Sequence, residues 1–243
     1  MKYRLLLFCL IPLFTAAQAD SVSAGIYQWQ TPKKEQPVIL FEGAVHDFSW
    51  IQASSNNIEA GKNSSKQSED VEQLLIIHSG TATLNLNGVA YPLIPGSIAT
   101  ILPGQSYSLS NNTSAACNYY LFKYKGKHSI NKEKQSTVIN WSDIKFTPHD
   151  KGGIRNFMEQ QTAMSKRLEI HVTTLNAGIK SHEPHTHRAE EMVIMIEGQT
   201  EMQIGESFYK GRPGDIYFLK SNVLHAIRNE GTKPCMYFAI QFE

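Results

Sequence analysis

The sequence has few cysteines and almost no net charge, and both shortages exclude whole classes of protein. Three cysteines occur among 243 residues, and no two form a CxxC pair. This argues against a zinc ribbon, a redox dithiol and a disulfide-rich small domain. Lys and Arg total 23 against 22 Asp and Glu, so the chain lacks the positive field that attracts nucleic acids or anionic membranes. We therefore expect no nucleic-acid partner.

Long apolar runs are also missing after the first residues. Leu5 to Phe14 is an apolar run that follows Lys2 and Arg4, and Ala17-Gln18-Ala19 has the small-residue pattern of a signal-peptide cleavage site. The run is shorter than the roughly 20 helical residues that span a bilayer. We predict that residues 1–19 are a cleaved signal peptide. The mature protein is then periplasmic or secreted, with no membrane association after cleavage.

The rest of the chain contains two copies of one unit. Between residues 76 and 119, many side chains recur 118 positions later without a gap: Ile76, Gly80, Tyr91, Pro95, Gly96, Ile98, Asn111, Cys117 and Tyr119 return as Ile194, Gly198, Tyr209, Pro213, Gly214, Ile216, Asn229, Cys235 and Tyr237. Such a register predicts a tandem duplication. We place the units at 20–125 and 151–243, joined by a polar, Lys-rich linker at 126–150.

Each unit has the pattern of an antiparallel β-fold, and no long amphipathic helix is predicted. Residues 73–78 and 192–196 are apolar runs rich in β-branched residues. Alternating segments follow and end at turn residues, Asn87-Gly88 and Gly205-Glu206. Short strands at regular spacing indicate an all-β chain of two jelly-roll barrels.

Side chains that can bind a metal gather between residues 182 and 191: His182, His185, His187, Glu190 and Glu191. On a strand, His185 and His187 point to the same face because side chains alternate. Glu191 opens the next apolar run with the same parity, and His225 is a fourth candidate farther along the chain.

These residues resemble the two motifs of the cupin family. Gly178, His185-Thr186-His187, Glu191 and Gly198 are similar to the first motif, and Gly214-Asp215, His225 and Asn229 are similar to the second. The spacing from Gly178 to His185 is one residue longer than usual. With the duplication, the chain resembles a bicupin over nearly all of its mature length. The resemblance implies jelly-roll barrels, with one divalent ion held in the mouth of the second by His185, His187, Glu191 and His225.

The chemistry of these four ligands agrees with that implication. Three imidazoles and a carboxylate suit a first-row divalent ion such as Mn, Fe, Ni or Zn, without deciding among them. Four protein ligands leave one or two positions open for water or substrate, as in catalytic sites. The set with its dication has a net charge of +1, which favours a small anionic substrate.

The first unit has no equivalent ligand set. The positions 118 residues before the four ligands are Gln67, Glu69, Gln73 and Tyr107, and none is an imidazole. We therefore expect one metal site per chain. The first barrel would act as a scaffold, a wall of the pocket or a dimerisation surface, and homo-oligomerisation is left open.

Three further residues are candidates for the pocket: His171, Tyr217 and Met195. His171 alternates with Leu168, Ile170 and Val172, so it faces outward if the apolar set fills the barrel. Aromatic and Met side chains on strands also serve as simple core. His182 lies outside the motif, and we interpret it as a solvated loop histidine.

Cys117 and Cys235 occupy equivalent positions of the two units. A disulfide between them is one reading in an exported protein. We favour two buried free thiols.

Two classes of function fit the sequence. The first is a metal-dependent bicupin enzyme with aminohydrolase-, isomerase- or dioxygenase-type chemistry. A degenerate first barrel beside a metal-bearing second one resembles the ureidoglycine aminohydrolases, but that family has Glu, His, His and Gln where this chain has His185, His187, Glu191 and His225. Neither its substrate nor its metal is transferred. The alternative is a non-catalytic bicupin that binds a small molecule through the ion, or a storage-like protein.

Overall fold

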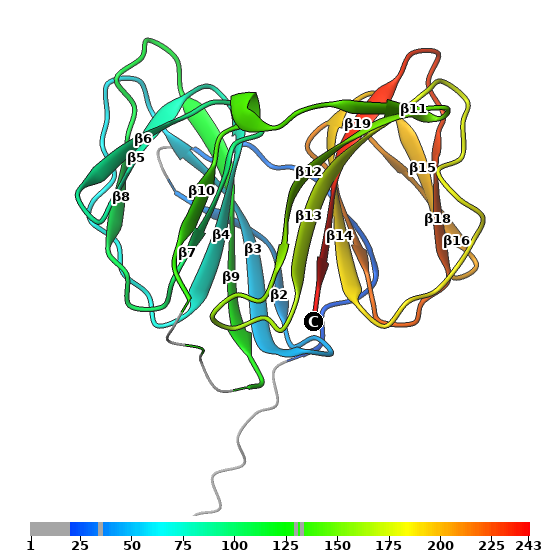
Figure 1. The fold of residues 1–243 in the computed structure, drawn as a ribbon, viewed down its shortest axis with the longest axis horizontal. Coiled ribbons are helices and arrows are strands. Elements are labelled where there is room, and N and C mark those ends of the chain that lie inside the picture. Colours follow the sequence, from blue (N-terminus) through cyan, green and yellow to red (C-terminus); the bar gives the residue numbers. More distant parts are fainter. Residues whose placement is uncertain (1–19, 34–35, 129–130, 132–133) are drawn as a thin grey trace, which may run out of the picture.

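The structure is a computed structural model that describes residues 20–243 except 34–35, 129–130 and 132–133. The predicted signal peptide therefore lies outside the described residues. In the described part, all regular structure is β-strand apart from one 3-10 turn, η1 (Trp141–Asp143), and the strands form two barrels side by side (Figure 1). This confirms the predicted all-β bicupin architecture. No helix of the described part is long or apolar enough to cross a membrane.

Each barrel combines a large and a small antiparallel sheet. The first has the orders β10-β7-β4-β9-β3-β2 and β6-β5-β8, and the second has β1-β17-β14-β19-β13-β12-β11 and β16-β15-β18. The first-barrel strands are β2 (Val38–Gly43), β3 (Phe48–Ile58), β4 (Glu72–Ser79), β5 (Ala82–Leu86), β6 (Val89–Leu93), β7 (Ile98–Ile101), β8 (Tyr107–Ser110), β9 (Cys117–Gly126) and β10 (Thr137–Ile139). The second-barrel strands are β1 (Gly25–Tyr27), β11 (Thr147–His149), β12 (Gly152–Gln160), β13 (Leu168–Leu175), β14 (Glu190–Glu197), β15 (Thr200–Ile204), β16 (Ser207–Gly211), β17 (Ile216–Leu219), β18 (His225–Asn229) and β19 (Cys235–Phe242).

The positions at which the strands begin show the same duplication as the sequence. Each of the strands β4 to β9 begins 118 residues before its counterpart among β14 to β19. The offset falls to 117 at the strand before them, because Ile58 pairs with Cys117 while Leu175 pairs with Cys235. The second unit therefore has one extra residue between Leu175 and His185. That insertion explains the longer spacing between Gly178 and His185.

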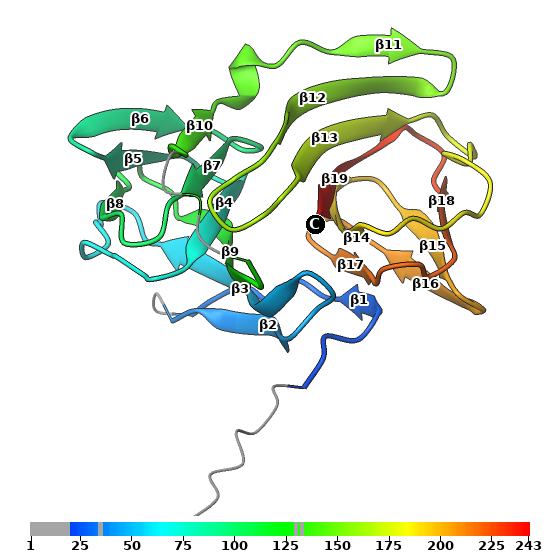
Figure 2. The same ribbon diagram turned by 60° about the horizontal axis from the view of Figure 1, so that its bottom comes forward.

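One short strand crosses from its own unit to the other barrel. β1 pairs with β17, with Ile26 opposite Tyr217, and Figure 2 shows it beside the second barrel. The first barrel receives its equivalent edge strand from β10, where Val138 lies opposite Ala99. Residues 25–27, placed in the first unit by the sequence, thus extend the sheet of the second, and part of the predicted linker extends the sheet of the first. Each strand satisfies an otherwise open sheet edge.

The hydrophobic core has three parts. Two clusters fill the barrel interiors, and the third lies between the barrels, where the two large sheets face each other. This third cluster contains aromatic residues from both sides: Phe41, Phe48, Tyr120, Phe122 and Tyr124, and Phe218, Phe238 and Phe242. Phe48 stacks on Tyr124 and on Phe242, each at 4.8 Å between ring centroids. The barrels therefore share a buried core.

A buried glutamate at the start of each central strand ties one barrel to the other. Glu72 on β4 accepts hydrogen bonds from the Thr162 hydroxyl at 2.8 Å and the Met164 amide at 2.7 Å, both before β13. Glu190 on β14 accepts one from the His46 amide at 2.8 Å, before β3. Burial raises the pKa of both carboxyl groups. We call these two contacts the glutamate clasps.

Candidate metal centre

The structure brings the four predicted ligands to the mouth of the second barrel. The backbones of His185 and His225 exchange two hydrogen bonds, of 3.1 and 3.0 Å, so the segment before β14 is held against β18. Nitrogen atoms of His185, His187 and His225 all lie within 4.8 Å of one another. Glu191 Oε2 lies 3.1 Å from His187 Nε2 and 3.7 Å from His225 Nε2. Ligand atoms about 2.1 Å from one ion lie roughly 3 to 3.5 Å apart. The two Glu191 distances are near this spacing, whereas imidazole nitrogens as much as 4.8 Å apart would have to move closer to share an ion.

Backbone carbonyls orient two of the imidazoles. The Nδ1 of His187 lies 2.8 Å from the Ala189 carbonyl oxygen, and the Nδ1 of His225 lies 2.8 Å from that of Val223. A carbonyl only accepts, so each Nδ1 donates and each Nε2 faces the other ligands, as in metal-binding histidines. The Nε2 of His225 is buried and has no hydrogen-bond partner among the described residues. Buried polar atoms normally have partners, so this atom fits a metal ligand.

Burial, hydrogen bonds and neighbouring charges shift the pKa values of the cluster in different directions. The hydrogen bond with Glu191 raises the pKa of His187, whereas burial lowers the pKa of His225. Burial acts to raise the pKa of Glu191, but the hydrogen bond with His187 and the charges of the two histidines outweigh it, and the pKa falls. The carboxylate is thus ionised beside imidazoles, a donor set that suits a divalent transition metal.

A cavity of about 170 Å³ adjoins the cluster, and His171 lines it together with His185, Glu191 and His225. The expectation that His171 faces outward assumed that Leu168, Ile170 and Val172 fill the barrel. They pack instead in the core between the barrels, so the alternate residues of β13 face the second barrel's interior. The Nδ1 of His171 lies 3.2 Å from Glu169 Oε1.

The other two pocket candidates lie deeper. Met195 and Tyr217 are fully buried within the apolar interior of the second barrel and do not line this cavity, unlike Val193 and Leu219. Residues two apart on a strand point to the same face. Met195 therefore points inward like Val193, and Tyr217 like Leu219, but each lies one layer deeper than the residue that lines the cavity. The Tyr217 hydroxyl lies 3.1 Å from that of Thr200.

His182 lies in a loop, as predicted, but it is half-buried and not simply solvated. Its ring lies edge-on to that of His185, with centroids 4.1 Å apart, and it lines the cavity. Burial lowers its pKa. Sequence reasoning excluded it because it lies outside the motif.

Sequence reasoning also missed Gln241 on β19. Its Nε2 lies 3.4 Å from Glu191 Oε2, and Arg167 Nη1 donates to its Oε1 at 3.3 Å. The alternation of Tyr237, Ala239 and Gln241, all of which line the cavity, was the signal that could have found it.

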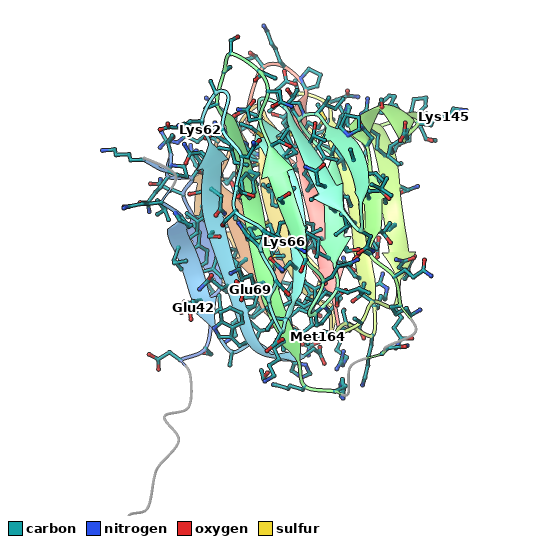
Figure 3. The ribbon with its side chains drawn as sticks, turned by 90° about the vertical axis from the view of Figure 1, so that its left-hand side faces the viewer. Glu42, Lys62, Lys66, Glu69, Lys145 and Met164 are labelled. Carbon is teal, nitrogen blue, oxygen red and sulfur yellow. The ribbon has the colours of Figure 1, made fainter. Side chains whose placement is uncertain are left out.

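The equivalent mouth of the first barrel is closed by its own side chains. The Tyr107 hydroxyl lies 3.0 Å from Gln67 Oε1 and 2.9 Å from Gln73 Oε1, and Lys123 Nζ donates to Glu69 Oε1 at 2.7 Å. Figure 3 shows Glu69 on this side of the molecule, with the exposed Lys62 and Lys66. Amides and a phenol replace the imidazoles, so this set does not favour a transition metal.

Two further motif positions are structural. Asn229 donates through its amide to the carbonyls of Leu175 and Lys233, at 2.8 and 2.9 Å, which fixes the loop before β19. Cys117 and Cys235 are buried and free, as the favoured reading predicted.

The comparisons with known proteins agree with the fold. Residues 171–241 match the family model described as "Cupin domain". The second barrel is a cupin domain. All four predicted ligands and His171 lie in this cupin domain. A search of the curated proteins finds no match.

Solved structures extend the likeness from this cupin domain to both barrels. AerE from Microcystis aeruginosa has a TM-score of 0.69 and 17% identity, covering 90% of this chain and 99% of that one. A protein from Pseudomonas aeruginosa described as glyoxylate-induced has a TM-score of 0.71 and 16% identity, covering 96% and 93%. The oxalate decarboxylase of Lactobacillus farciminis, solved with formate, has a TM-score of 0.64 and 11% identity, covering 91% and 87%. At these identities the likeness shows the fold alone.

Proposed function

We propose that this protein is an exported, metal-dependent bicupin enzyme that acts on a small anionic metabolite at one site in its second barrel. The observation that carries the proposal is the convergence of His185, His187, Glu191 and His225, where the buried Nε2 of His225 has no hydrogen-bond partner in the described part of the chain. A closed structural site would use all of its ligand positions, whereas this set leaves positions open beside a cavity.

The charge of the site supports an anionic substrate. A dication with three neutral imidazoles and one carboxylate has a net charge of +1, and His171 and His182 line the same cavity. Arg167 holds Gln241, which lines the cavity, and is itself paired with Glu159 and Glu169. Oxalate and formate, the small anions named for one structural neighbour, belong to the class that we propose.

The bound ion would supply Lewis-acid stabilisation of negative charge on a substrate oxygen. The chain itself supplies the other functions. The Nδ1 contact with Glu169 fixes the ring of His171, so His171 is the cavity residue that we expect to move a proton. Gln241, held by Arg167, keeps Glu191 in place and offers its amide to a substrate carboxylate.

The test is elemental analysis of the chain starting at Asp20, followed by a screen of small carboxylates with and without oxygen. We expect about one transition-metal ion per chain. Oxygen uptake would indicate a dioxygenase, ammonia release an aminohydrolase, and turnover without either an isomerase. Bound metal without turnover of any substrate would instead favour the non-catalytic binding protein.

Matched variants locate the ion. His187→Ala should abolish bound metal and leave the β-sheet circular dichroism unchanged. Tyr107→Phe, at the position equivalent to His225 in the first barrel, should leave the metal content unchanged. Full metal content in His187→Ala would contradict the proposed centre.

Export has its own test. Fractionation of expressing cells and N-terminal sequencing should find a chain that begins at Asp20 outside the cytoplasm. A cytoplasmic chain that retains residues 1–19 would refute this part of the proposal and leave the metal centre untouched.

A further inference from the structure

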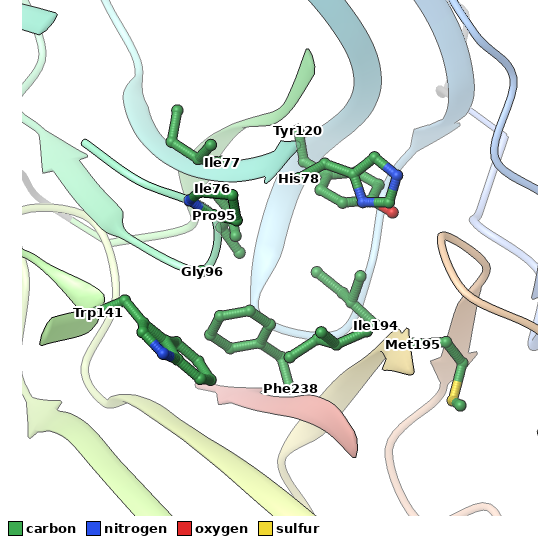
Figure 4. Close-up of a pocket in the computed structure, with 11 residues that line it drawn as sticks. Ile76, Ile77, His78, Pro95, Gly96, Tyr120, Trp141, Ile194, Met195 and Phe238 are labelled. Carbon is green, nitrogen blue, oxygen red and sulfur yellow. The ribbon is translucent and has the colours of Figure 1, made fainter. Parts of the chain in front are cut away.

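A second cavity, of about 230 Å³, lies between the two barrels and is lined by residues outside the metal centre. Figure 4 shows its walls: Ile76 and Tyr120 from the first barrel, Ile194 and Phe238 from the second, and Trp141 from the segment that connects them. No charged side chain lines it apart from the titratable His78. The cavity thus offers an apolar surface with three aromatic rings.

The cavity lies where the two repeats face each other. Ile76 and Ile194 are equivalent positions of the repeat, and so are Tyr120 and Phe238. At one pair of equivalent positions the side chains differ in kind, because the first barrel has the imidazole of His78 where the second has the aliphatic side chain of Ile196. One end of an otherwise apolar cavity is therefore polar.

His78 is held by ring contacts and not by hydrogen bonds. Its ring centroid lies 4.4 Å from that of Trp29 and 5.5 Å from that of Tyr120. Neither ring nitrogen has a hydrogen-bond partner among the described residues, and burial lowers the pKa of His78. The Tyr120 hydroxyl already donates to the Gly214 carbonyl at 2.6 Å. A neutral imidazole, able to accept or donate one hydrogen bond, is thus the polar group available to a ligand here.

The size of the cavity limits what can occupy it. An apolar cavity of about 150 Å³ stays dry and binds benzene, and this one is larger. Unfilled apolar space destabilises a protein because the lining atoms lose their contacts. A charged ligand would lose its hydration without a counter-charge in the walls. The best match is an uncharged ring compound with one hydrogen-bonding group.

We propose that the inter-barrel cavity binds a small uncharged aromatic molecule, of one ring or two fused rings, that carries a single hydroxyl or N–H group bonded to His78. This site is separate from the proposed metal centre and does not depend on it.

Calorimetric titration of the full mature chain with three probes tests the proposal. p-Cresol should bind with a stoichiometry of one. Toluene, which lacks the hydroxyl, should bind about tenfold more weakly, because one hydrogen bond is worth about one tenfold step in affinity. 4-Methylbenzoate, which is charged, should not displace p-cresol, because the walls of this cavity offer no counter-charge. His78→Phe keeps an aromatic ring against Trp29 and should reduce p-cresol affinity to the level of toluene.

A cavity-filling variant tests whether the probes bind in the inter-barrel cavity. Ile194→Phe should abolish binding of both p-cresol and toluene and raise the melting temperature, whereas His187→Ala at the metal centre should leave p-cresol binding unchanged. NMR of isoleucine methyl groups in the unmodified chain gives the same answer without a cavity variant. Shifts on adding toluene should appear at Ile76, Ile194 and Ile196 and not at Ile58 or Ile204 in the barrel interiors.

No saturable binding of p-cresol or toluene up to their solubility would overturn the proposal. Methyl shifts at Ile204 in the interior of the second barrel, with none at Ile76, Ile194 or Ile196, would also overturn it. Displacement of p-cresol by 4-methylbenzoate at similar concentrations would refute the uncharged class of ligand.

Discussion

At the scale of single residues, the proposed metal centre depends on which nitrogen of each imidazole carries a proton. The carbonyls of Ala189 and Val223 hold the Nδ1 protons of His187 and His225, so Nε2 is the atom that an ion and a proton compete for. Without an ion, a raised pKa means that protonated His187 stabilises the fold most below the ordinary pKa of about 6.5. That contribution is lost as the pH rises through the raised pKa.

Because a proton and the ion compete for Nε2, the metal affinity should fall as the pH is lowered. Because the contact with Glu191 raises the pKa of His187, the affinity should begin to fall at a higher pH than for a free imidazole. Below that pKa we expect a loss of about tenfold per pH unit for one displaced proton. Competition titrations with a chromogenic chelator between about pH 5 and 8 measure this. An affinity that is flat across this range would contradict the assignment of His187.

Asn229 illustrates a motif residue whose role is structural, and the repeat supplies its control. Asn111 donates to the carbonyls of Ile58 and Ala115, at 3.0 and 2.8 Å, in the same way as Asn229 does in the second barrel. Asn111→Ala and Asn229→Ala should each cost about 2–4 kcal/mol in free energy of unfolding, because buried carbonyls lose their donors. Denaturant unfolding gives the cost, and elemental analysis should find the metal unchanged in both. Loss of metal in Asn229→Ala alone would show a role beyond the loop.

At the scale of elements, local pattern predicted the repeated strands well. The hairpins β5–β6 and β15–β16 were readable because alternation and turn residues act within a few positions. Motif spacing also grouped His185, His187, Glu191 and His225. The strand alternation expected for His185 and His187 was wrong, because both lie before β14 and His185 forms only an isolated bridge with His225. It could not show that Leu168, Ile170 and Val172 pack against the other barrel, and this reversed the predicted direction of His171. The exchange of β1 into the second sheet likewise depends on a distant partner, β17.

The glutamate clasps give a paired prediction at this scale. Glu72 accepts from two amides and a hydroxyl, through both carboxylate oxygens, whereas Glu190 accepts from one amide and its Oε1 has no partner among the described residues. A side-chain amide at position 72 would place its N–H against a backbone N–H of Ala163 or Met164, so a hydrogen bond would be lost. Glu72→Gln should therefore cost about 1–3 kcal/mol at neutral pH, and Glu190→Gln should cost less than about 1 kcal/mol.

The pH dependence of the clasps follows from their raised pKa values. A carboxyl group whose pKa is higher in the folded chain stabilises the fold most below its unfolded pKa of about 4.3. Stability then falls as the pH rises toward the folded value. Glu190→Gln removes that fall, so its stability relative to the unmodified chain should improve from pH 4 to pH 7. Chemical denaturation at several pH values measures it, and a relative loss with rising pH would contradict the burial argument.

At the scale of the whole molecule, the two barrels differ in the side chains at their mouths and share one core. Only the second mouth offers imidazoles, while the first closes on itself through Tyr107 and Lys123. Both large sheets nevertheless contribute to the cluster between the barrels. The first barrel therefore covers an apolar face of the second barrel.

The last prediction concerns the second barrel expressed alone as residues 151–243. This fragment contains every predicted ligand, but it lacks β1 at the edge of β17 and exposes an apolar face that the intact chain buries: Met192, Ile194, Phe218, Phe238, Ile240 and Phe242. A contiguous apolar surface of this kind drives association, and an open sheet edge adds to it. We expect the fragment to aggregate or dimerise in size-exclusion chromatography, whereas residues 20–243 remain soluble. A monomeric fragment that unfolds cooperatively would show that the second barrel folds without the first. The core shared by the two barrels would then not be needed for the stability of the second.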